Sequence, residues 1–372
     1  VKTKDGNYQE FEGEIEINLT DMNSVFSMPI EKDKSSLLVS YRRSWYDLLI
    51  SAMASESDSA MALPFIEAFQ SKYTNKLTKD HKLTINLAGF HEGVATELSK
   101  ENSNDSSIEG EWNYDSKRII SSIQLDSIIN KELVNNITFS YNKWDAFYKL
   151  GGDMDMDSEA KAETITIRDD LTYELNDSHK LQFGGLFYKY IDNEKMSWVI
   201  LPNPYEAGSV TRDSTYTIND TFSILGAYIQ DVWTIDPKHK LTFGGRLDYT
   251  QIGDYRGNPI FHPRLSYLFE YDKDTKFKAY YGKYSQMIVK SSYNSINGSD
   301  VAGSLADVRP EIAYHYGAGV ERYLAENTLF KAEVFYKDYT DMIIDSGSYL
   351  ENDYSNIGQG KASGLEVMLQ KF

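Results

Sequence analysis

The feature of this sequence that most limits its fold is a strict alternation of apolar and polar residues in many separate runs. Between Phe11 and Leu19 the odd positions are apolar or glycine, and the even positions are polar: Glu12, Glu14, Glu16 and Asn18. Because successive side chains of a β-strand point to opposite faces, such a run forms a strand with one apolar and one polar face. The same alternation recurs at residues 241–250, 313–321 and 365–370. The sequence therefore predicts an all-β protein.

Short polar turns separate these runs. Their Asp, Asn, Pro and Lys residues are typical of tight turns. Seven such turns occur, at residues 30–34, 78–82, 129–132, 176–180, 236–240, 272–276 and 325–327. Between them lie much longer connections, for instance 93–117, 193–215 and 289–308. Seven turns join about fourteen strands, and the runs outside them raise the expected number to about sixteen.

Alternating short and long connections are typical of bacterial outer-membrane barrels, with short turns on the periplasmic side and long loops outside. The composition agrees, since 13% of residues are aromatic but only 41% are hydrophobic and the mean hydropathy is -0.49. No apolar run approaches the roughly 18 residues of a membrane-spanning helix. A soluble sandwich would share the period of two but seldom carries so many inward charges, and a propeller would show a blade repeat. We predict an antiparallel transmembrane β-barrel in the outer membrane.

Charge and residue types also restrict the function. The net charge of -18 argues against binding to nucleic acid, because proteins bind its phosphates through clustered Lys and Arg. The chain has no cysteine, which excludes disulfides and Cys-based metal sites. Its six histidines are scattered, and no catalytic or zinc-binding spacing is present. We therefore expect neither an enzyme nor a bound cofactor.

Several segments carry a resemblance to a known family. The run VKTKDG at residues 1–6, followed by the strand from 11 to 19, resembles the plug-to-barrel junction of TonB-dependent outer-membrane receptors. Residues 29–47 are similar to that family's first periplasmic turn and third strand, although Met28 stands where members often have Gly. Further similar segments follow in family order at 227–249, 263–286, 309–321 and 356–366.

The resemblance implies a longer protein with a plug domain and a barrel of about 22 strands. We therefore expect residues 1–7 to be the end of the plug, and residues 8–372 to be a partial barrel with about 16 strands of those 22. The implied function is a receptor that binds a scarce nutrient at its extracellular loops and imports it with energy from TonB. The implied partners are outer-membrane lipid, the protein's own plug, TonB and an unidentified nutrient.

Two alternatives stay open. A passive porin is one, since about sixteen strands could close a barrel unaided. The alternation, however, places the terminal Phe372 on the polar side with Glu366 and Gln370, whereas a terminal aromatic of a porin should face lipid. The other alternative is a receptor-like barrel that serves as a scaffold in an outer-membrane complex, with a lipoprotein or another outer-membrane subunit as its partner.

Candidate site residues are few. Arg42, Arg43 and Arg246, with Arg264, could bind a ligand in the lumen or form lumenal ion pairs. Aromatic stacking on a sugar is the hypothesis for Trp112 and Trp198, both expected in outer loops. A calcium site is the hypothesis for three carboxylates at alternate positions, and an acidic solvated loop is its alternative, because no EF-hand glycine or glutamate follows. These carboxylates are Asp153, Asp155 and Asp157.

The alternation also predicts which residues face lipid and which face the lumen. We expect lipid contact for Phe11, Ile15, Ile17, Leu241, Phe243, Tyr314, Leu365 and Val367. We expect the lumenal side to carry Glu12, Glu14, Glu16, Arg246, Glu321 and Glu366. If six strands are missing, the first and last strands of this chain should not pair with each other.

Overall fold

The computed structural model describes residues 4–53, 60–98, 110–151, 154–200, 212–252, 255–286, 309–345 and 354–372. These residues form one helix, α1 (Tyr46–Met53), and seventeen strands. The strands are β1 (Glu12–Ile17), β2 (Asp21–Glu31), β3 (Ser35–Ser44), β4 (Ala60–Lys76), β5 (His81–Leu98), β6 (Gly110–Ile128), β7 (Leu133–Leu150), β8 (Met154–Glu174), β9 (His179–Ile200), β10 (Arg212–Asp236), β11 (His239–Ile252), β12 (Tyr255–Arg256), β13 (Ile260–Glu270), β14 (Thr275–Gln286), β15 (Glu311–Ala325), β16 (Thr328–Asp345) and β17 (Tyr354–Lys371). Among the described residues, no helix is long and apolar enough to cross a membrane.

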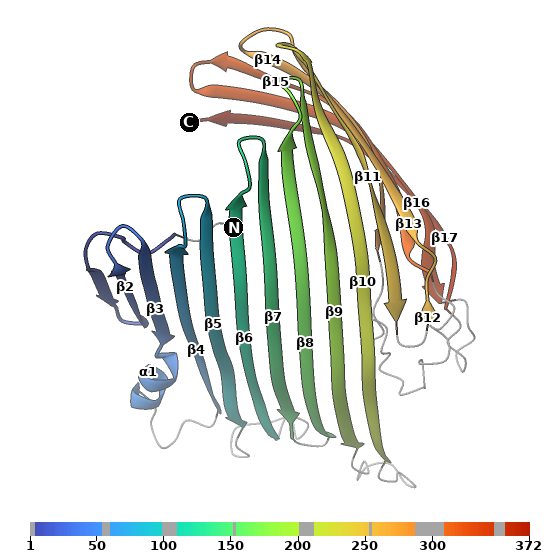
Figure 1. Cartoon of the computed structure of the whole chain (residues 1–372). Coiled ribbons are helices and arrows are strands. Elements are labelled where there is room, and N and C mark those ends of the chain that lie inside the picture. The colour runs from blue at the N-terminus through green and yellow to red at the C-terminus, as the bar shows by residue number, and fades with distance from the viewer. Residues whose placement is uncertain are drawn as a thin grey trace. The chain divides into compact units, whose positions relative to one another are not determined.

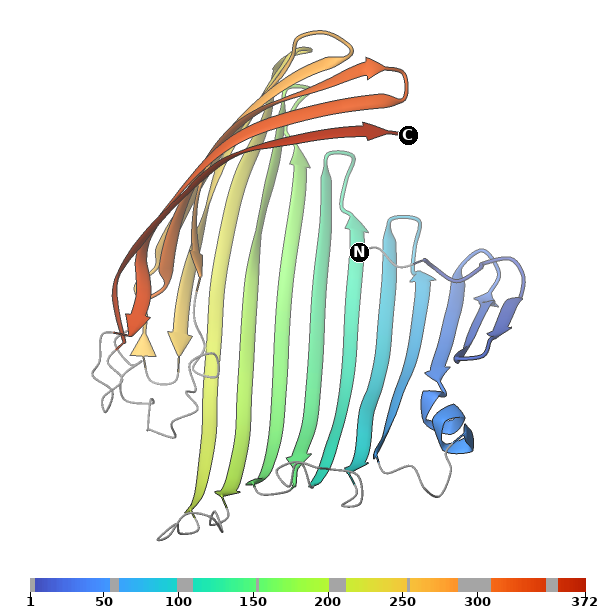
Figure 2. The ribbon, with the colours of Figure 1, turned by 180° about the vertical axis from the view of Figure 1, so that it is seen from behind.

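The chain divides into two compact units. Unit 1 comprises residues 1–127, 137–167 and 188–221, and unit 2 comprises residues 128–136, 168–187 and 222–372. In unit 1, β1 to β6 pair antiparallel in chain order (Figure 1). In unit 2, β10 pairs with β11, β11 with β13, and β13 to β17 follow in chain order (Figure 2). Strand β12 has two residues and extends the β11 pairing, so the other sixteen strands of the described chain match the expected number.

The seven short turns are confirmed, and side-chain capping stabilises several of them. Asn130 Oδ1 accepts hydrogen bonds from the backbone N–H groups of Glu132 and Leu133, at 2.9 and 2.8 Å. Asn176 and Asp236 cap their own turns in the same way. Such local bonds satisfy backbone donors that the strand ladders leave free. In unit 1, the β2–β3 and β4–β5 turns lie at one end, the short-turn end, and α1 lies at the other (Figure 1).

The expected boundaries of two long connections are wrong. The sequence predicts a loop over residues 93–117, but β5 continues to Leu98 and β6 begins at Gly110. It also predicts a loop over residues 193–215, but β9 continues to Ile200 and β10 begins at Arg212. The third expected loop, 289–308, lies outside the described residues. Strand ends that meet water on both faces carry no apolar alternation, so periodicity does not reveal them.

The predicted register is confirmed within each unit. In unit 2, the ladders join Phe243 to Leu265, Leu265 to Tyr281 and Tyr281 to Tyr316, so these side chains share one face. By the same pairing, this apolar face also carries Leu241, Tyr314, Leu365 and Val367, and the opposite, polar face carries Arg246, Glu321 and Glu366. In unit 1, the apolar face carries Phe11, Ile15 and Ile17, and the polar face carries Glu12, Glu14 and Glu16.

The apolar face is uncovered by protein. Ile17 is 67% exposed, Leu365 is 65% exposed and Val367 is 60% exposed, values that are unfavourable for large apolar side chains in water. Lipid contact accounts for this exposure. Strand β1 pairs with β2, and β17 pairs with β16. The expected lack of pairing between β1 and β17 stays a prediction.

A row of charged residues ends the apolar face in unit 1. Neighbours across the β3–β6 ladders form this row, which lies away from the short-turn end: Arg43, Glu67, His91 and Lys117. On β6, eight residues separate Leu125 from Lys117, about 26 Å along a strand. That length is comparable with the apolar band of about 25 Å in outer-membrane barrels. The charged row therefore lies where the outer boundary of the membrane is expected.

Candidate functional site

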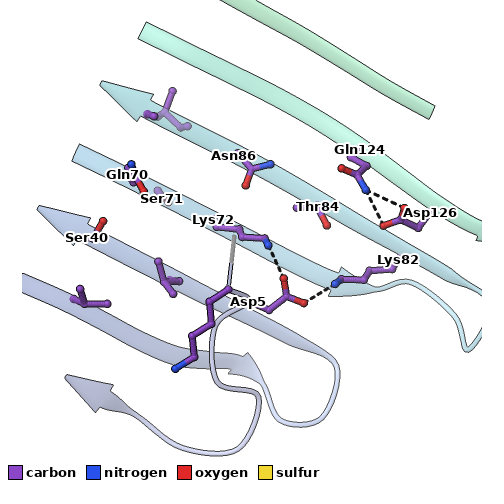
Figure 3. A pocket seen from close by; sticks show the side chains of 15 residues that line it. Asp5, Ser40, Gln70, Ser71, Lys72, Lys82, Thr84, Asn86, Gln124 and Asp126 are labelled. Carbon is purple, nitrogen blue, oxygen red and sulfur yellow. Dashed lines mark hydrogen bonds and ion pairs between the residues drawn. The ribbon is translucent and has the colours of Figure 1, made fainter. Parts of the chain in front are cut away.

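Residues 4–10 lie on the polar face of unit 1 and are held there by charge. Asp5 Oδ1 lies 2.6 Å from Lys72 Nζ on β4, and its other carboxylate oxygen pairs with Lys82 on β5 (Figure 3). Burial alone would raise the pKa of Asp5. The hydrogen bonds from Lys72 and Lys82 outweigh burial and hold its pKa below the usual value. Asp5 is therefore a carboxylate at neutral pH, tied to two strands.

Neutral contacts fix the same segment. Tyr8 donates a hydrogen bond to Thr74 Oγ1 at 2.8 Å, and Thr74 lies 2.7 Å from Ser36 Oγ. Thr74 and Ser36 are fully buried beneath the segment. A Cβ on Gly6 would lie 2.8 Å from the Leu37 carbonyl oxygen, so only glycine allows this close backbone approach. The segment is thus docked by shape as well as by charge.

A cavity of about 990 Å³ lies between this segment and β2–β6. Besides Asp5, Lys72 and Lys82, its lining has two more charged residues, Lys4 and Asp126, and four apolar residues. Its neutral polar residues include Ser40, Gln70, Thr84, Asn86 and Gln124 (Figure 3). Asn86 donates to Ser122 Oγ at 3.0 Å, and Gln124 donates to Asp126 at 2.9 Å. Amides and hydroxyls of this kind offer both donors and acceptors. The wall can hydrogen-bond to a polar ligand or to another part of the protein.

On β14, β15 and β16, the polar face of unit 2 carries charges that neutralise one another. Lys278 lies 3.1 Å from Glu321 and 3.6 Å from Glu333, and Lys331 lies 3.3 Å from Glu321. Tyr280 donates a hydrogen bond to Glu333 at 2.9 Å. This network joins three neighbouring strands, β14, β15 and β16. Such lumenal ion pairs stabilise the wall without creating a strong net charge.

The structure separates Arg42 from Arg43. Arg42 lies on the polar face, and its guanidinium is 3.3 Å from Asp21. Arg43 lies on the apolar face, in the charged row, 2.9 Å from Glu67 and 3.0 Å from Asp47 of α1. The prediction of a lumenal Arg43 is therefore wrong, because consecutive strand residues point to opposite faces. Arg246 lies on the polar face as predicted, and ligand binding by these arginines stays a prediction.

The two candidate tryptophans lie in strands rather than in loops. Trp112 lies on β6, opposite Thr96, and is 37% exposed. Trp198 lies on β9 and is half-buried. The expectation of loops is wrong, because both residues belong to strands that extend into the expected loop regions. A sugar-stacking role for them stays a prediction.

The calcium hypothesis remains untested. Asp155 and Asp157 are exposed side chains on one face of β8, so the alternative expectation of an acidic loop is wrong for these two residues. Asp153 lies outside the described residues. Within the described part of the chain, no three His, Cys, Asp or Glu side chains form a group able to hold a metal ion.

The residues that anchor the segment 4–10 are not evident from sequence patterns. Lys72 and Lys82 each look like an ordinary strand lysine. The signal that could have found them is their position, because both fall on the polar face and close to the same short turn. Their partner, Asp5, belongs to the VKTKDG run that carries the family resemblance.

Residues 67–371 match the sequence profile of the family described as TonB dependent receptor-like, beta-barrel. The chain belongs to this family. It is therefore part of an outer-membrane receptor barrel, and its family contains receptors and transporters rather than enzymes. This agrees with the exposed apolar face and the charged, hydrogen-bonded polar face of each unit.

Solved structures show the same fold at low sequence identity. The ferripyoverdine receptor of the Pseudomonas aeruginosa outer membrane has a TM-score of 0.71 at 13% identity, with 99% of this chain and 55% of that one covered. The ferric-catecholate import receptor Fiu from Escherichia coli K12 has a TM-score of 0.68 at 12% identity, with 99% and 63% covered. The copper transporter OprC has a TM-score of 0.70 at 13% identity, with 98% and 59% covered. This chain thus spans between about half and two thirds of these proteins, and no curated protein sequence matches it.

Proposed function

We propose that the protein is a TonB-dependent receptor that binds a scarce nutrient on the outer side of the membrane and imports it with energy supplied through TonB. The observation that carries this proposal is the family match over residues 67–371. In this proposal residues 1–7 are the end of a plug domain, and residues 8–372 are part of the barrel that surrounds it.

The docked segment supports a plug. Asp5 and Tyr8 hold residues 4–10 on the polar face, so the chain enters the barrel wall from the side where a plug must lie. The ion pairs of Asp5 with Lys72 and Lys82, and the paired charges on β14–β16, suit a lumen filled by folded protein and water. An unpaired charge facing a plug would cost several kcal/mol, whereas a paired or neutral wall avoids that cost.

Ferric chelates are the first nutrients to test, because two of the structural relatives are receptors of ferripyoverdine and ferric catecholates. The test uses the full-length protein in cells that lack other iron receptors, with uptake of an ⁵⁵Fe-catecholate complex measured with and without TonB. We expect uptake that requires both the protein and TonB. If ferric chelates fail, a copper complex and a cobalamin follow in the same assay, and TonB-independent uptake of any of them would contradict the proposal.

A second measurement separates the receptor from a passive porin. The full-length protein inserted into a planar bilayer should give no steady conductance, because a plug closes the lumen. A steady open channel with ohmic conductance would instead establish a porin. Co-purification of a stoichiometric lipoprotein, together with the absence of TonB-dependent uptake of all these ligands, would favour a scaffold subunit.

A further inference from the structure

Three arginines meet in a small cavity on the polar face of unit 2. The cavity has a volume of about 440 Å³ and is bordered by β8, β9, β10, β11 and β13. Its charged lining consists of Arg168, Arg246 and Arg264. Tyr228, Gln182 and Gln230 supply its neutral polar groups, and the two glutamines are hydrogen-bonded to each other at 2.5 Å. We call it the arginine pocket.

Two of the arginines have carboxylate partners. Arg246 lies 2.7 Å from Asp248, and its Nε contacts both carboxylate oxygens at 2.8 Å. Arg168 forms an ion pair with Asp170, which also accepts a hydrogen bond from Tyr228 at 2.5 Å. Each of these pairs is locally neutral. They surround the third arginine without competing for an incoming anion.

Arg264 has no such partner. Among the described residues, no carboxylate lies within ion-pair distance of its exposed guanidinium, whose nearest ring is Tyr284, at 5.1 Å from the ring centroid. Counting all three arginines and the two paired aspartates, the pocket has an excess of one positive charge. An aromatic face stabilises a guanidinium but leaves its N–H donors unused.

Two glycines are the ladder partners of Arg264 on the neighbouring strands. Its ladder partners are Gly244 on β11 and Gly282 on β14, so no side chain stands directly opposite it on either neighbouring strand. Neither glycine is easily replaced, because a Cβ on Gly244 would lie 2.4 Å from the Ile229 carbonyl oxygen and one on Gly282 would meet the Tyr284 ring at 2.8 Å. The guanidinium lines the arginine pocket beside the Tyr284 ring.

We infer that the arginine pocket binds an anionic oxygen group of the imported ligand, a carboxylate or a phosphate, through Arg264. The planar guanidinium fits both oxygens of such a group with two parallel N–H donors. The amides of Gln182 and Gln230 are placed to bond to neighbouring ligand atoms. This inference rests on the proposed import function, to which it adds that the ligand is an anion.

The test measures binding of citrate and of pyrophosphate to the full-length protein in detergent, by isothermal titration calorimetry at about 50 mM salt. Arg264→Gln should weaken binding by about tenfold or more, and Arg264→Lys should recover only part of the loss because it keeps the charge without the planar fork. The matched control is Arg118→Gln. Arg118 also lies on the polar face over an aromatic ring, 5.9 Å from Trp144, but outside the pocket, so its replacement should change affinity by less than about twofold.

Binding of citrate alone or pyrophosphate alone would support the inference and identify the group. Absence of binding of both anions to the wild-type protein, equal affinities for wild type and Arg264→Gln, or equal losses in Arg264→Gln and Arg118→Gln would overturn it. Transport is scored separately. If uptake is absent or independent of TonB but anion binding still depends on Arg264, the import proposal fails and the anion site stands. If uptake depends on TonB but anion binding does not depend on Arg264, only the arginine pocket is refuted.

Discussion

Two isoleucines on β6 offer a direct test of the register. Ile123 lies on the apolar face, 49% exposed, and Ile120 lies on the polar face, 36% exposed. Replacing each by lysine introduces the same charge into the same strand. The only large difference is the solvent that each side chain meets.

The depth of Ile123 sets the expected magnitude. The apolar stretch of β6 runs from Leu125 to the charged row at Lys117, so Ile123 lies two residues from its centre, about 7 Å along the strand. A lysine costs about 2–4 kcal/mol at the bilayer midplane and about 0–1 kcal/mol near the interface. We expect Ile123→Lys to lower the free energy of unfolding by about 2–3 kcal/mol, a factor of about 30–150 in the folding equilibrium. Ile120→Lys should change it by less than about 0.5 kcal/mol.

Guanidinium-induced unfolding of the full-length protein in lipid vesicles, followed by tryptophan fluorescence, measures both variants. Heat-modifiable migration on gels checks that each variant inserts. Equal destabilisation at the two positions, or a larger loss for Ile120→Lys, would refute the assignment of the faces.

Arg43→Gln should destabilise the protein by about 1–3 kcal/mol, because it leaves two carboxylates, Asp47 and Glu67, without their cation. Arg42→Gln should destabilise it by less than about 1 kcal/mol. The reverse order in the same unfolding assay would contradict the placement of Arg43. Asp5→Asn should speed hydrogen exchange of residues 4–10 at pH 7. The pKa of Asp5 is lower in the folded protein, so its stabilising contribution is complete above the unfolded pKa of about 3.9. The wild type should therefore lose the same protection only as the pH falls below that value. Unchanged exchange in Asp5→Asn would show that charge does not hold the segment. Gly6→Ala should displace the same segment, with fast exchange at 4–10 and an unchanged unfolding midpoint, since its Cβ would strike the backbone of β3; normal protection would refute the close approach.

The sequence predicts the membrane part of this fold well, for a physical reason. Where one face meets lipid and the other meets polar surroundings, selection enforces a period of two, as at Leu365 and Val367. Turn caps such as Asn130 are equally local, so the seven turns follow from neighbouring residues alone. The strand number and the two faces therefore follow from the order of the amino acids.

The candidate site is less predictable because its contacts are distant in the sequence. Asp5 meets Lys72 and Lys82 only when three separate segments come together, and no local pattern marks that meeting. Arg43 shows a different weakness, since its charge suggests the lumen although the alternation already assigns it to the other face. In such strands, position decides the environment of a side chain more reliably than its chemistry does.

The continuation of β5 and β6 beyond the charged row has a consequence for ligand capture. On β5, seven residues follow His91 before the strand ends at Leu98, which is about 23 Å of strand. The hydrogen-bonded ladder persists there, from Glu92 opposite Ser116 to Leu98 opposite Gly110. The paired ends of β5 and β6 therefore extend beyond the expected level of the lipid headgroups. A molecule that arrives from outside contacts these strands before it can reach the bilayer.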